Sequence, residues 1–230
     1  MSSKLIKLNG VAGIDEAGRG PMIGPLVVCG VLVSKSELKK MMRIRIRDSK
    51  VLSAKQRNEF AIEIKKHAEK IEYSIVSASD IDWLRSNRIT LNEIEVRSFV
   101  SIAKKLQPAE LYMDAADVNA QRFGDAIGNR SGLQEAGCKI VSEHKADSKF
   151  TVVSAASIMA KVKRDNRVLK LHKKYGDFGS GYPSDPKTVE FVRGLVFSGE
   201  EIPNIVRKSW KSVTKIIAEA ETTQTTLDSF

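Results

Sequence analysis

The chain has 230 residues, of which 42% are hydrophobic and 29% charged, and these proportions are typical of a folded globular protein. No apolar run reaches about 18 residues, so we expect no membrane span, and the N-terminus lacks the pattern of a signal peptide. The two cysteines, Cys29 and Cys138, lack metal-site spacing, so we expect reduced thiols in a cytoplasmic protein. The net charge of +10 favours a polyanionic partner, with nucleic acid as the first candidate.

Strand and helix signals follow one another along the chain. Residues 5–15 and 25–33 predict two strands joined by a Gly/Pro turn, and the second is apolar almost throughout, as burial on both faces requires. Apolar spacing and capping residues then predict short strands and helices; the strands fall at 73–78, 111–114 and 138–142, and the helices at 36–47, 53–70, from 79 or 80, 90–106, 152–175, 186–198 and 204–219. This order predicts an α/β domain with its site at one edge of the sheet, followed by a small helical addition.

The stretch from Val11 to Pro21 carries the first candidate site. A short apolar run delivers two adjacent carboxylates, Asp15 and Glu16, and the turn Gly18-Arg19-Gly20 follows at once. Adjacent residues of a strand point to opposite faces, so these carboxylates can share a site only if the strand ends or bends there. The glycines permit a bend, and Arg19 adds a planar cation suited to phosphate. The stretch indicates a carboxylate site beside a phosphate-binding turn, and the alternative is a solvated acidic turn at a strand end.

Further motifs, in a fixed order, cover nearly the whole chain. They are Gly-Ile-Asp15-Glu16-Ala-Gly-Arg-Gly-Pro, Asp48-Ser-Lys-Val-Leu, Tyr-Met-Asp114-Ala-Ala-Asp-Val-Asn, His-Lys-Ala-Asp147-Ser-Lys, Val-Ser-Ala-Ala-Ser-Ile-Met-Ala-Lys-Val-Lys-Arg-Asp and Gly179-Ser-Gly-Tyr182-Pro-Ser-Asp-Pro. Each is weak alone, but together they are specific, and through them the chain resembles ribonuclease HII of the archaeal type. The resemblance implies an RNase H-like fold, in which a mixed β-sheet is flanked by helices. Together with the chain's composition, it gives a catalytic domain over residues 1–180, a C-terminal helical extension over 181–217 and, because the last residues are polar and Thr-rich, a flexible tail over 218–230.

The resemblance also selects four catalytic and metal-binding carboxylates, which spacing alone does not pick out from 28 acids: Asp15, Glu16, Asp114 and Asp147. An all-oxygen ligand set suits Mg²⁺ or Mn²⁺ rather than zinc, and clustered carboxylates need cations to offset their repulsion. The implied activity is two-metal hydrolysis of the RNA strand of RNA/DNA hybrids and incision at ribonucleotides embedded in duplex DNA. The products would carry 5′-phosphate and 3′-hydroxyl ends, and the implied roles are ribonucleotide excision repair and primer removal.

Substrate-binding residues follow from the same resemblance. Gly18, Arg19 and Gly20 match the family turn that contacts the ribose 2′-hydroxyl, the group that distinguishes RNA from DNA locally. Tyr182 matches the tyrosine that packs against the sugar at the RNA–DNA junction, although without the family it would be read as a packing residue. Lys50 is interpreted as a phosphate contact.

Other polar residues have a structural interpretation beside the functional one. For Asp48 and Ser49 the two interpretations are equally balanced. Asp117 is expected to be a turn acceptor, Asp165 a helix ion-pair partner, and His144 an exposed or capping residue rather than a catalytic one. The basic part of the long helix is expected to be partly a solvated face and partly a phosphate track, which predicts salt-sensitive binding; it holds Lys161, Lys163, Arg164, Arg167, Lys170, Lys173 and Lys174. Trp83 and Trp210 are assigned to packing.

The C-terminal tail carries a second motif, Gln224-Thr-Thr-Leu227-Asp-Ser-Phe230. It resembles the box by which replication and repair enzymes dock on a sliding clamp, in which Gln224 enters a polar pocket and Leu227 and Phe230 fill a hydrophobic one. The usual box has two consecutive aromatic residues, and this chain ends after the first.

The competing functions are other nucleases and, from a different class, a binding module without catalysis. A DNA-only nuclease such as a junction resolvase would share the fold, but the Gly-Arg-Gly turn and Tyr182 argue against it. Ribonuclease HI would lack that turn, and ribonuclease HIII would add an N-terminal domain. A clamp-tethered nucleic-acid-binding module without catalysis is disfavoured because four carboxylates hinder DNA binding unless they hold metal. Nothing in the sequence requires more than a monomer.

Overall fold

The computed structural model describes residues 7–44, 46 and 52–227, so Asp48, Ser49, Lys50 and Phe230 lie outside the described residues. The chain forms two compact units. The first unit takes the residues up to 17, 27–75 and 92–164, and the second takes 18–26, 76–91 and those from 165 onward. This grouping differs from the predicted boundary after residue 180, because the turn after the first strand and a helix near residue 80 join the C-terminal helices.

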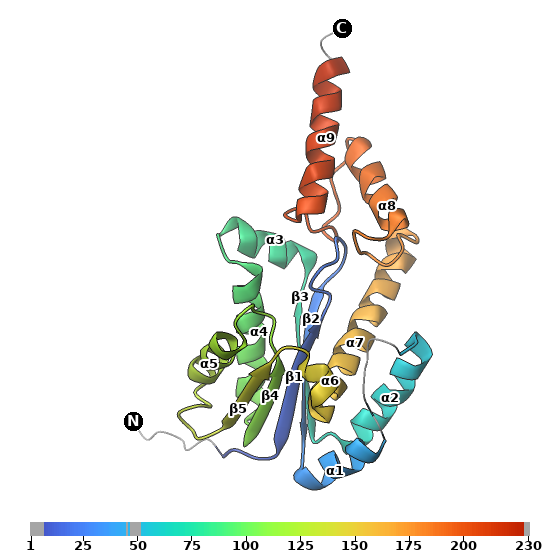
Figure 1. Cartoon of the computed structure of the whole chain (residues 1–230). Helices are drawn as coiled ribbons and strands as arrows, with labels where there is room; N and C mark the ends of the chain where they lie inside the picture. Colours follow the sequence, from blue (N-terminus) through green and yellow to red (C-terminus); the bar gives the residue numbers. More distant parts are fainter. Residues whose placement is uncertain (1–6, 45, 47–51, 228–230) are drawn as a thin grey trace. The chain divides into compact units, whose positions relative to one another are not determined.

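In the described part of the chain, five strands of the first unit form one mixed sheet in the order β3-β2-β1-β4-β5 (Figure 1). β1 pairs antiparallel with β2 and parallel with β4, and β4 pairs parallel with β5. Parallel strands end at the same edge of a sheet, so the residues that close β1, β4 and β5 gather there. The strands are β1 Val11–Ala17, β2 Leu26–Val33, β3 Lys70–Val76, β4 Glu110–Asp114 and β5 Lys139–Glu143.

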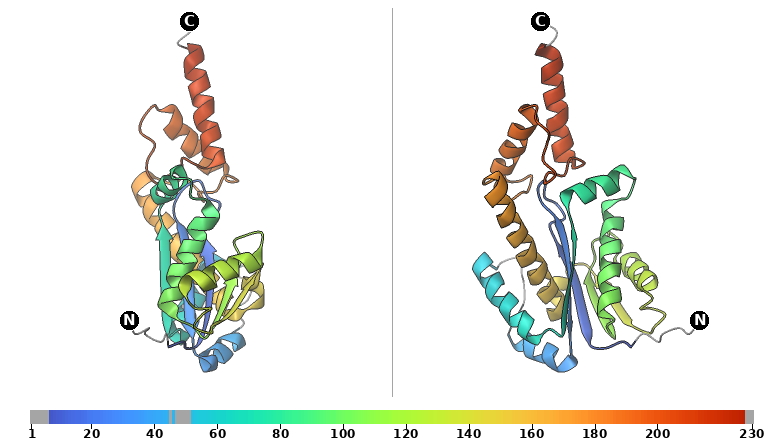
Figure 2. Two further views of the ribbon diagram at one scale, coloured as in Figure 1. Left: turned by 90° about the vertical axis from the view of Figure 1, so that its left-hand side faces the viewer. Right: turned by 180° about the vertical axis from the view of Figure 1, so that it is seen from behind.

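Helices cover both faces of this sheet (Figure 2). One face shares an apolar core with α1 (Lys35–Arg43), α2 (Ala54–His67) and the first half of α7 (Thr151–Tyr175). The other face packs on α4 (Leu91–Leu106) and α5 (Ala120–Ser131). Because the sheet is covered on both sides, β1 and β2 are apolar on both sides, as the sequence indicates. Ser53 caps α2, as predicted, and a reciprocal bond from Gln56 completes a capping box.

The second unit has a core of its own. Met22 and Ile23, from the turn after β1, pack with residues of α8 (Pro186–Phe197), α9 (Lys211–Leu227) and the segment between them. The turn also forms an isolated β-bridge, Ile23 to Val206, with that segment. α3 (Ala78–Ser86) joins the unit through Asp82, whose carboxylate accepts hydrogen bonds from the main-chain N–H groups of Lys208 and Ser209. Among the described residues, no helix combines the length and apolar character needed to cross a bilayer.

The last helix differs from the prediction. A helix over 204–219 and a flexible tail from 218 are expected from the sequence, but α9 begins at Lys211 and continues to Leu227. The cause is local: residues 218–221 are Ala-Glu-Ala-Glu, which have high helix propensity and carry the helix forward into the Thr-rich segment. Gln224 and Leu227 therefore belong to helical backbone, one turn apart.

Candidate active site

Strand pairing brings Asp15 and Asp114 together. The parallel register of β1 and β4 matches Ile14 with Met113, so the residues that follow, Asp15 and Asp114, are neighbours on the same face of the sheet. That face is the one covered by α7, because Val11 and Ala17, which share the alternation of Asp15, belong to its core. Asp15 is buried, with 4% of its surface exposed, and Asp114 is half-buried at the strand end.

The third carboxylate comes from α6 (Ala146–Lys149), a single turn that follows β5. The main-chain N–H of Ala146 donates a 2.9 Å hydrogen bond to Asp114 Oδ1, which fixes this turn against the end of β4. Asp147 follows directly and is as buried as Asp15. Carboxylate oxygens of Asp15, Asp114 and Asp147 consequently all lie within 4.8 Å of one another.

The electrostatics of the cluster are those of a cation site. Burial raises the pKa of Asp15, and the charges of Glu16 and Asp114 raise it further. Hydrogen bonds from the Ser157 hydroxyl and from the Glu16 N–H, at 2.7 Å, act in the opposite direction and favour the ionised form. Ser157 is itself held by Lys161, whose Nζ donates to Ser157 Oγ at 3.0 Å. The fold therefore holds together carboxylates that repel one another unless a cation lies between them.

Glu16 lies on the same strand as Asp15, next to the three clustered aspartates. The register of β1 with β2 is unbroken from Val11 to Ala17, so the strand neither ends nor bends between Asp15 and Glu16. Alternation directs Glu16 to the sheet face opposite that of Asp15, and the cluster of three carboxylates does not include it. Its charge still acts on Asp15 through the pKa shift, because the two residues are adjacent near the end of the strand.

The predicted substrate residues of the second unit lie side by side. Gly20 lies beside the ring of Tyr182: a Cβ atom on this glycine would be in ordinary van der Waals contact with it, 3.7 Å from Tyr182 Cε1. The carbonyl of Gly181, which precedes the tyrosine, accepts hydrogen bonds from Met22 N–H at 2.7 Å and Ile23 N–H at 3.2 Å. The Gly18–Gly20 turn and the Tyr182 loop are thus joined within one compact unit.

The other polar residues singled out in the sequence lie outside the carboxylate cluster. Asp117 is a turn acceptor, as predicted: it accepts from Asn119 N–H at 2.9 Å and pairs with Arg122 at 2.6 Å. His144 is exposed, and its Nε2 lies 3.2 Å from the Val118 carbonyl. This contact with the main chain is one expected of a structural residue. Of the basic residues of α7, Arg164 is buried and Lys163 lies 4.9 Å from the centre of the Tyr73 ring. Only the later cations are exposed, and these are Arg167, Lys170, Lys173 and Lys174.

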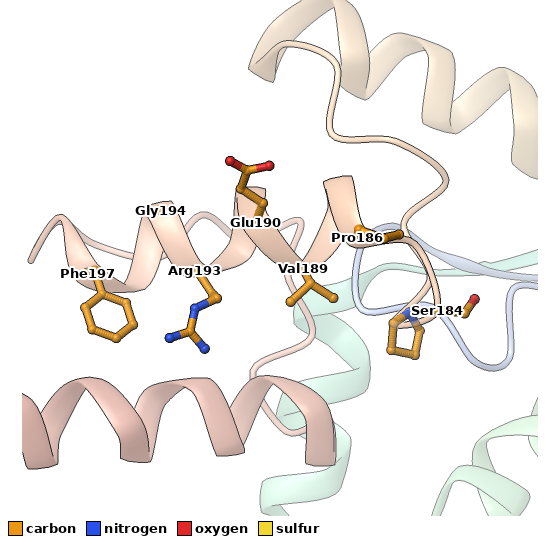
Figure 3. A pocket seen from close by; sticks show the side chains of 8 residues that line it. Ser184, Pro186, Val189, Glu190, Arg193, Gly194 and Phe197 are labelled. Atoms are coloured by element: carbon orange, nitrogen blue, oxygen red, sulfur yellow. The ribbon is translucent and has the colours of Figure 1, made fainter.

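A surface hollow of about 750 Å³ lies in the second unit (Figure 3). Arg193 and Phe197 point from α8 into the space beside α9, whereas Glu190 points away from it. Arg193 Nη1 lies 2.5 Å from Glu219 Oε2, so an ion pair joins α8 to α9. Its lining residues are Pro183, Ser184, Pro186, Val189, Glu190, Arg193, Gly194 and Phe197, and no predicted site residue is among them.

Comparison with known proteins identifies the family. The family model for ribonuclease HII matches residues 12–213. Ribonuclease HII of Pyrococcus furiosus is 47% identical over 225 residues, which cover 96% of this chain and 97% of that protein. The chain belongs to the ribonuclease HII family. A solved ribonuclease H2 of Pyrococcus horikoshii OT3, 38% identical, matches with a TM-score of 0.83 over 92% of this chain and 98% of that one.

A second solved relative is the ribonuclease HII family member in a PCNA:RNase HII complex from Archaeoglobus fulgidus. It is 42% identical and has a TM-score of 0.81, with 90% of this chain and 96% of that chain covered. These matches confirm the predicted RNase H-like fold with a mixed sheet flanked by helices. As a ribonuclease HII family member, the protein is a metal-dependent ribonuclease H with endonuclease activity.

The carboxylate cluster fits the metal dependence of the family. Its three residues offer only oxygen donors, gathered within 4.8 Å, and hard divalent cations prefer such donors. Asp15, Asp114 and Asp147 would hold the ion, and Ser157 with the Glu16 and Ala146 N–H groups would orient their carboxylates.

Ser157 supplies a first test of this arrangement. We expect Ser157→Ala to weaken Mn²⁺ binding about 10- to 100-fold, since loss of a hydrogen bond that orients a ligand has that effect. The measurement is the Mn²⁺ concentration at which the melting temperature has risen by half of the increase seen at saturating Mn²⁺. Ser154→Ala is the matched control, because Ser154 lies almost one turn earlier on α7 and is equally buried. If the melting temperatures of Ser157→Ala and Ser154→Ala depend equally on Mn²⁺, Ser157 has no role in binding the metal.

Proposed function

We propose that the protein cleaves the RNA strand of RNA/DNA hybrids and incises duplex DNA at embedded ribonucleotides, leaving 5′-phosphate and 3′-hydroxyl ends. The observation that carries this proposal is the convergence of Asp15, Asp114 and Asp147 at one sheet edge, in a member of the ribonuclease HII family. Glu16, whose charge acts on Asp15, completes the proposed set of catalytic carboxylates. Ribonucleotide excision repair and primer removal are the processes that such an activity would serve.

The cofactors proposed are two divalent ions, Mg²⁺ or Mn²⁺. When bound, they would supply an activated water and stabilise the charge on the departing 3′ oxygen. The chain itself contributes preorganisation: β1 and β4 hold two carboxylates in register, and the Ala146 N–H joins the third to them. Burial and repulsion by Glu16 and Asp114 destabilise the ionised form of Asp15 when no cation is bound. A bound cation would offset this cost, so the site favours cation binding.

Recognition of the ribonucleotide is assigned to the second unit. Gly18, Arg19 and Gly20 would contact the ribose 2′-hydroxyl, and Tyr182 would pack on the sugar of the following deoxynucleotide. The adjacency of Gly20 and the Tyr182 ring supports this proposal, since both would read neighbouring sugars of one strand. Lys50 stays a predicted phosphate contact, and the exposed cations of α7 are the candidate phosphate track.

The proposal is tested with a DNA duplex that contains one ribonucleotide, beside an all-DNA duplex of the same sequence. We expect incision on the 5′ side of the ribonucleotide with Mg²⁺ or Mn²⁺, no cleavage with chelator, and no cleavage of the all-DNA duplex. If the protein cleaves continuous hybrids but not the single-ribonucleotide duplex, it is a ribonuclease H that does not recognise single ribonucleotides. Binding without cleavage of either substrate would favour the nucleic-acid-binding module.

Tyr182 supplies a second test. We expect Tyr182→Ala to lower kcat/KM on the single-ribonucleotide duplex by about 10- to 100-fold, because ring stacking on a nucleotide contributes about 1–3 kcal/mol. Cleavage of a continuous hybrid, which has no junction at most of its phosphates, should fall by less. Tyr175→Ala is the matched control, since Tyr175 ends α7 in the same unit. An equal loss on both substrates would contradict the junction role.

The C-terminal box is proposed as a docking motif for a sliding clamp. A solved relative from Archaeoglobus fulgidus is in complex with PCNA, and α9 sets Gln224 and Leu227 three residues apart on one helix. We expect removal of residues 224–230 to abolish binding to the clamp of the same organism and to leave clamp-free cleavage unchanged. Surface plasmon resonance and a cleavage assay measure the two quantities. Undiminished clamp binding after truncation would contradict the assignment.

A further inference from the structure

A fully buried arginine holds the main chain of the Gly18-Arg19-Gly20 turn. The Arg207 guanidinium donates three hydrogen bonds to carbonyls: Nη2 to Gly18 at 2.6 Å, Nη1 to Arg19 at 3.0 Å and Nε to Gly24 at 3.0 Å. Arg207 has no exposed surface. A guanidinium is a planar fork with a fixed geometry, so three simultaneous bonds define the position of the turn more closely than a flexible side chain can.

Trp210 extends this contact to the third residue of the turn. Its indole Nε1–H donates to the Gly20 carbonyl at 3.1 Å, and its ring lies 4.6 Å from the Arg207 guanidinium. The carbonyls of Gly18, Arg19 and Gly20 thus each accept a hydrogen bond from a side chain about 190 positions later in the sequence.

The segment that carries Arg207 and Trp210 is itself anchored. The Arg207 N–H donates to the Met22 carbonyl at 2.8 Å, and Gly24 N–H donates to the Ile205 carbonyl at 2.9 Å. On the other side, Asp82 of α3 accepts from Lys208 N–H at 2.7 Å and from the Ser209 hydroxyl at 2.6 Å. All of these residues belong to the second compact unit.

The direction of these carbonyls determines where the donors of the turn point. All peptide bonds of the described residues are trans, and in a trans peptide the C=O and the following N–H point in opposite directions. Because the Gly18 and Arg19 carbonyls point to Arg207, the N–H groups of Arg19 and Gly20 point away from it. Two successive N–H donors are thereby presented on the side of the turn opposite Arg207, a suitable arrangement for an oxygen acceptor.

We propose that Arg207 and Trp210 are positioning residues for ribonucleotide recognition: they orient the Gly18–Gly20 turn so that its main-chain donors meet the sugar and phosphate of the ribonucleotide. The inference rests on the proposed function, in which this turn contacts the 2′-hydroxyl. Neither residue touches the substrate in this account. Their effect should therefore be on discrimination between ribose and deoxyribose and on KM, while kcat, which depends on the carboxylates of the other unit, is retained.

Trp210→Phe is the decisive variant, because it keeps a ring over Arg207 and removes the indole N–H that donates to the Gly20 carbonyl. We expect KM for the single-ribonucleotide duplex to rise about 3- to 10-fold, the effect of one hydrogen bond, with kcat within about twofold of the wild type. Trp83→Phe is the matched control: Trp83 lies in the same unit, but its side chain is 66% exposed, and KM should not change. Arg207→Lys, which keeps the charge and loses the fork, should raise KM further.

The melting temperature of each variant shows whether a change in KM comes from altered positioning of the turn or from loss of the fold. Arg207→Met would leave the Gly18, Arg19 and Gly24 carbonyls without the guanidinium donor and is expected to unfold the second unit, so it is not used as a test. A wild-type KM in Trp210→Phe, or an equal loss of kcat on ribonucleotide and continuous-hybrid substrates, would overturn the positioning role. Failure of the wild-type protein to incise at single ribonucleotides would instead overturn the proposed function.

Discussion

Asp15→Asn is expected to abolish cleavage and, at the same time, to stabilise the metal-free protein. Asp15 joins two other carboxylates at the end of β1, and the family is metal-dependent, so loss of one negative ligand removes charge that holds the ions. Metal catalysis contributes several kcal/mol and each 1.36 kcal/mol is a factor of ten, so kcat/KM should fall at least about 10³-fold. The measurement is cleavage of the single-ribonucleotide duplex at saturating Mn²⁺.

The stabilising half of this prediction depends on pH. Burial and the charges of Glu16 and Asp114 raise the pKa of Asp15, so the folded chain keeps this proton to higher pH than the unfolded chain does. The wild-type protein therefore loses stability as pH rises from the ordinary aspartate value of 3.8 through the raised pKa. Asn does not titrate, so the melting temperature of Asp15→Asn should match the wild type near pH 4 and exceed it at pH 7. Thermal unfolding with chelator measures both.

Asp117→Asn is the matched control for Asp15→Asn. The Asn119 N–H and the Arg122 guanidinium lower the pKa of Asp117, so this carboxylate supports stability above the ordinary aspartate pKa and loses that role in acid. Its replacement should lower the melting temperature at pH 7 and leave cleavage intact. Retained cleavage in Asp15→Asn, or a lower melting temperature in that variant at pH 7, would contradict the proposed site.

Gly13→Ala is expected to lower the melting temperature by about 2–12 °C. Gly13 lies on β1 where the start of α7 crosses it, and a Cβ atom there would overlap the main-chain carbonyl of Val152. A main-chain obstacle cannot rotate away, so α7 would have to shift, at a cost of about 1–3 kcal/mol or more. In a chain of this length each kcal/mol corresponds to about 2–4 °C. Because α7 carries Ser157 and Gly13 is two residues from Asp15, activity should fall together with stability.

The same substitution at Gly194 is expected to have the opposite sign. Gly194 lies within α8, and a Cβ atom there would have no neighbouring atom within 4 Å. Alanine is favoured over glycine in a helix by about 0.5–1 kcal/mol, so Gly194→Ala should raise the melting temperature by about 1–4 °C. Circular dichroism on both variants measures the pair. A melting temperature of Gly13→Ala at or above the wild-type value would contradict the close approach of α7 to β1.

The family resemblance selects Asp15 and Asp114, and patterns visible in the sequence then account for their meeting. Both come at the ends of short apolar runs, and strand order with parallel register then makes them neighbours. What the sequence does not contain is the strand order itself, which depends on long-range packing. Whether the strand ends or bends between Asp15 and Glu16 was likewise beyond the local sequence: pairing with β2 carries β1 past both residues to Ala17.

Helix α5 was missed because its sequence weakens the helical signal. It contains Gly124 and Gly128, which have low helix propensity. The structure gives their reason: α5 packs so closely on β5 that a Cβ atom on Gly124 would lie 2.8 Å from Ser142 Cβ. Such a requirement involves a strand 18 residues away and leaves no local pattern.

Trp210 and Arg207 show the same limit at the candidate site. The sequence assigns Trp210 to packing, and it assigns no role to Arg207. In the structure both side chains hold main-chain carbonyls of a distant turn. Main-chain acceptors have no residue identity, so a side chain that binds them has no partner that a sequence pattern can reveal. The residues that carry chemistry are easier to predict than those that hold them in place.

Anomalous X-ray scattering from crystals soaked in Mn²⁺ would test the central claim most directly, because it locates the metal without reference to activity. We expect a peak bounded by the carboxylates of Asp15, Asp114 and Asp147, and its loss in Asp15→Asn crystals treated in the same way. A peak only at other residues, or no peak at a Mn²⁺ concentration that supports cleavage, would contradict the assignment of this cluster as the catalytic metal site.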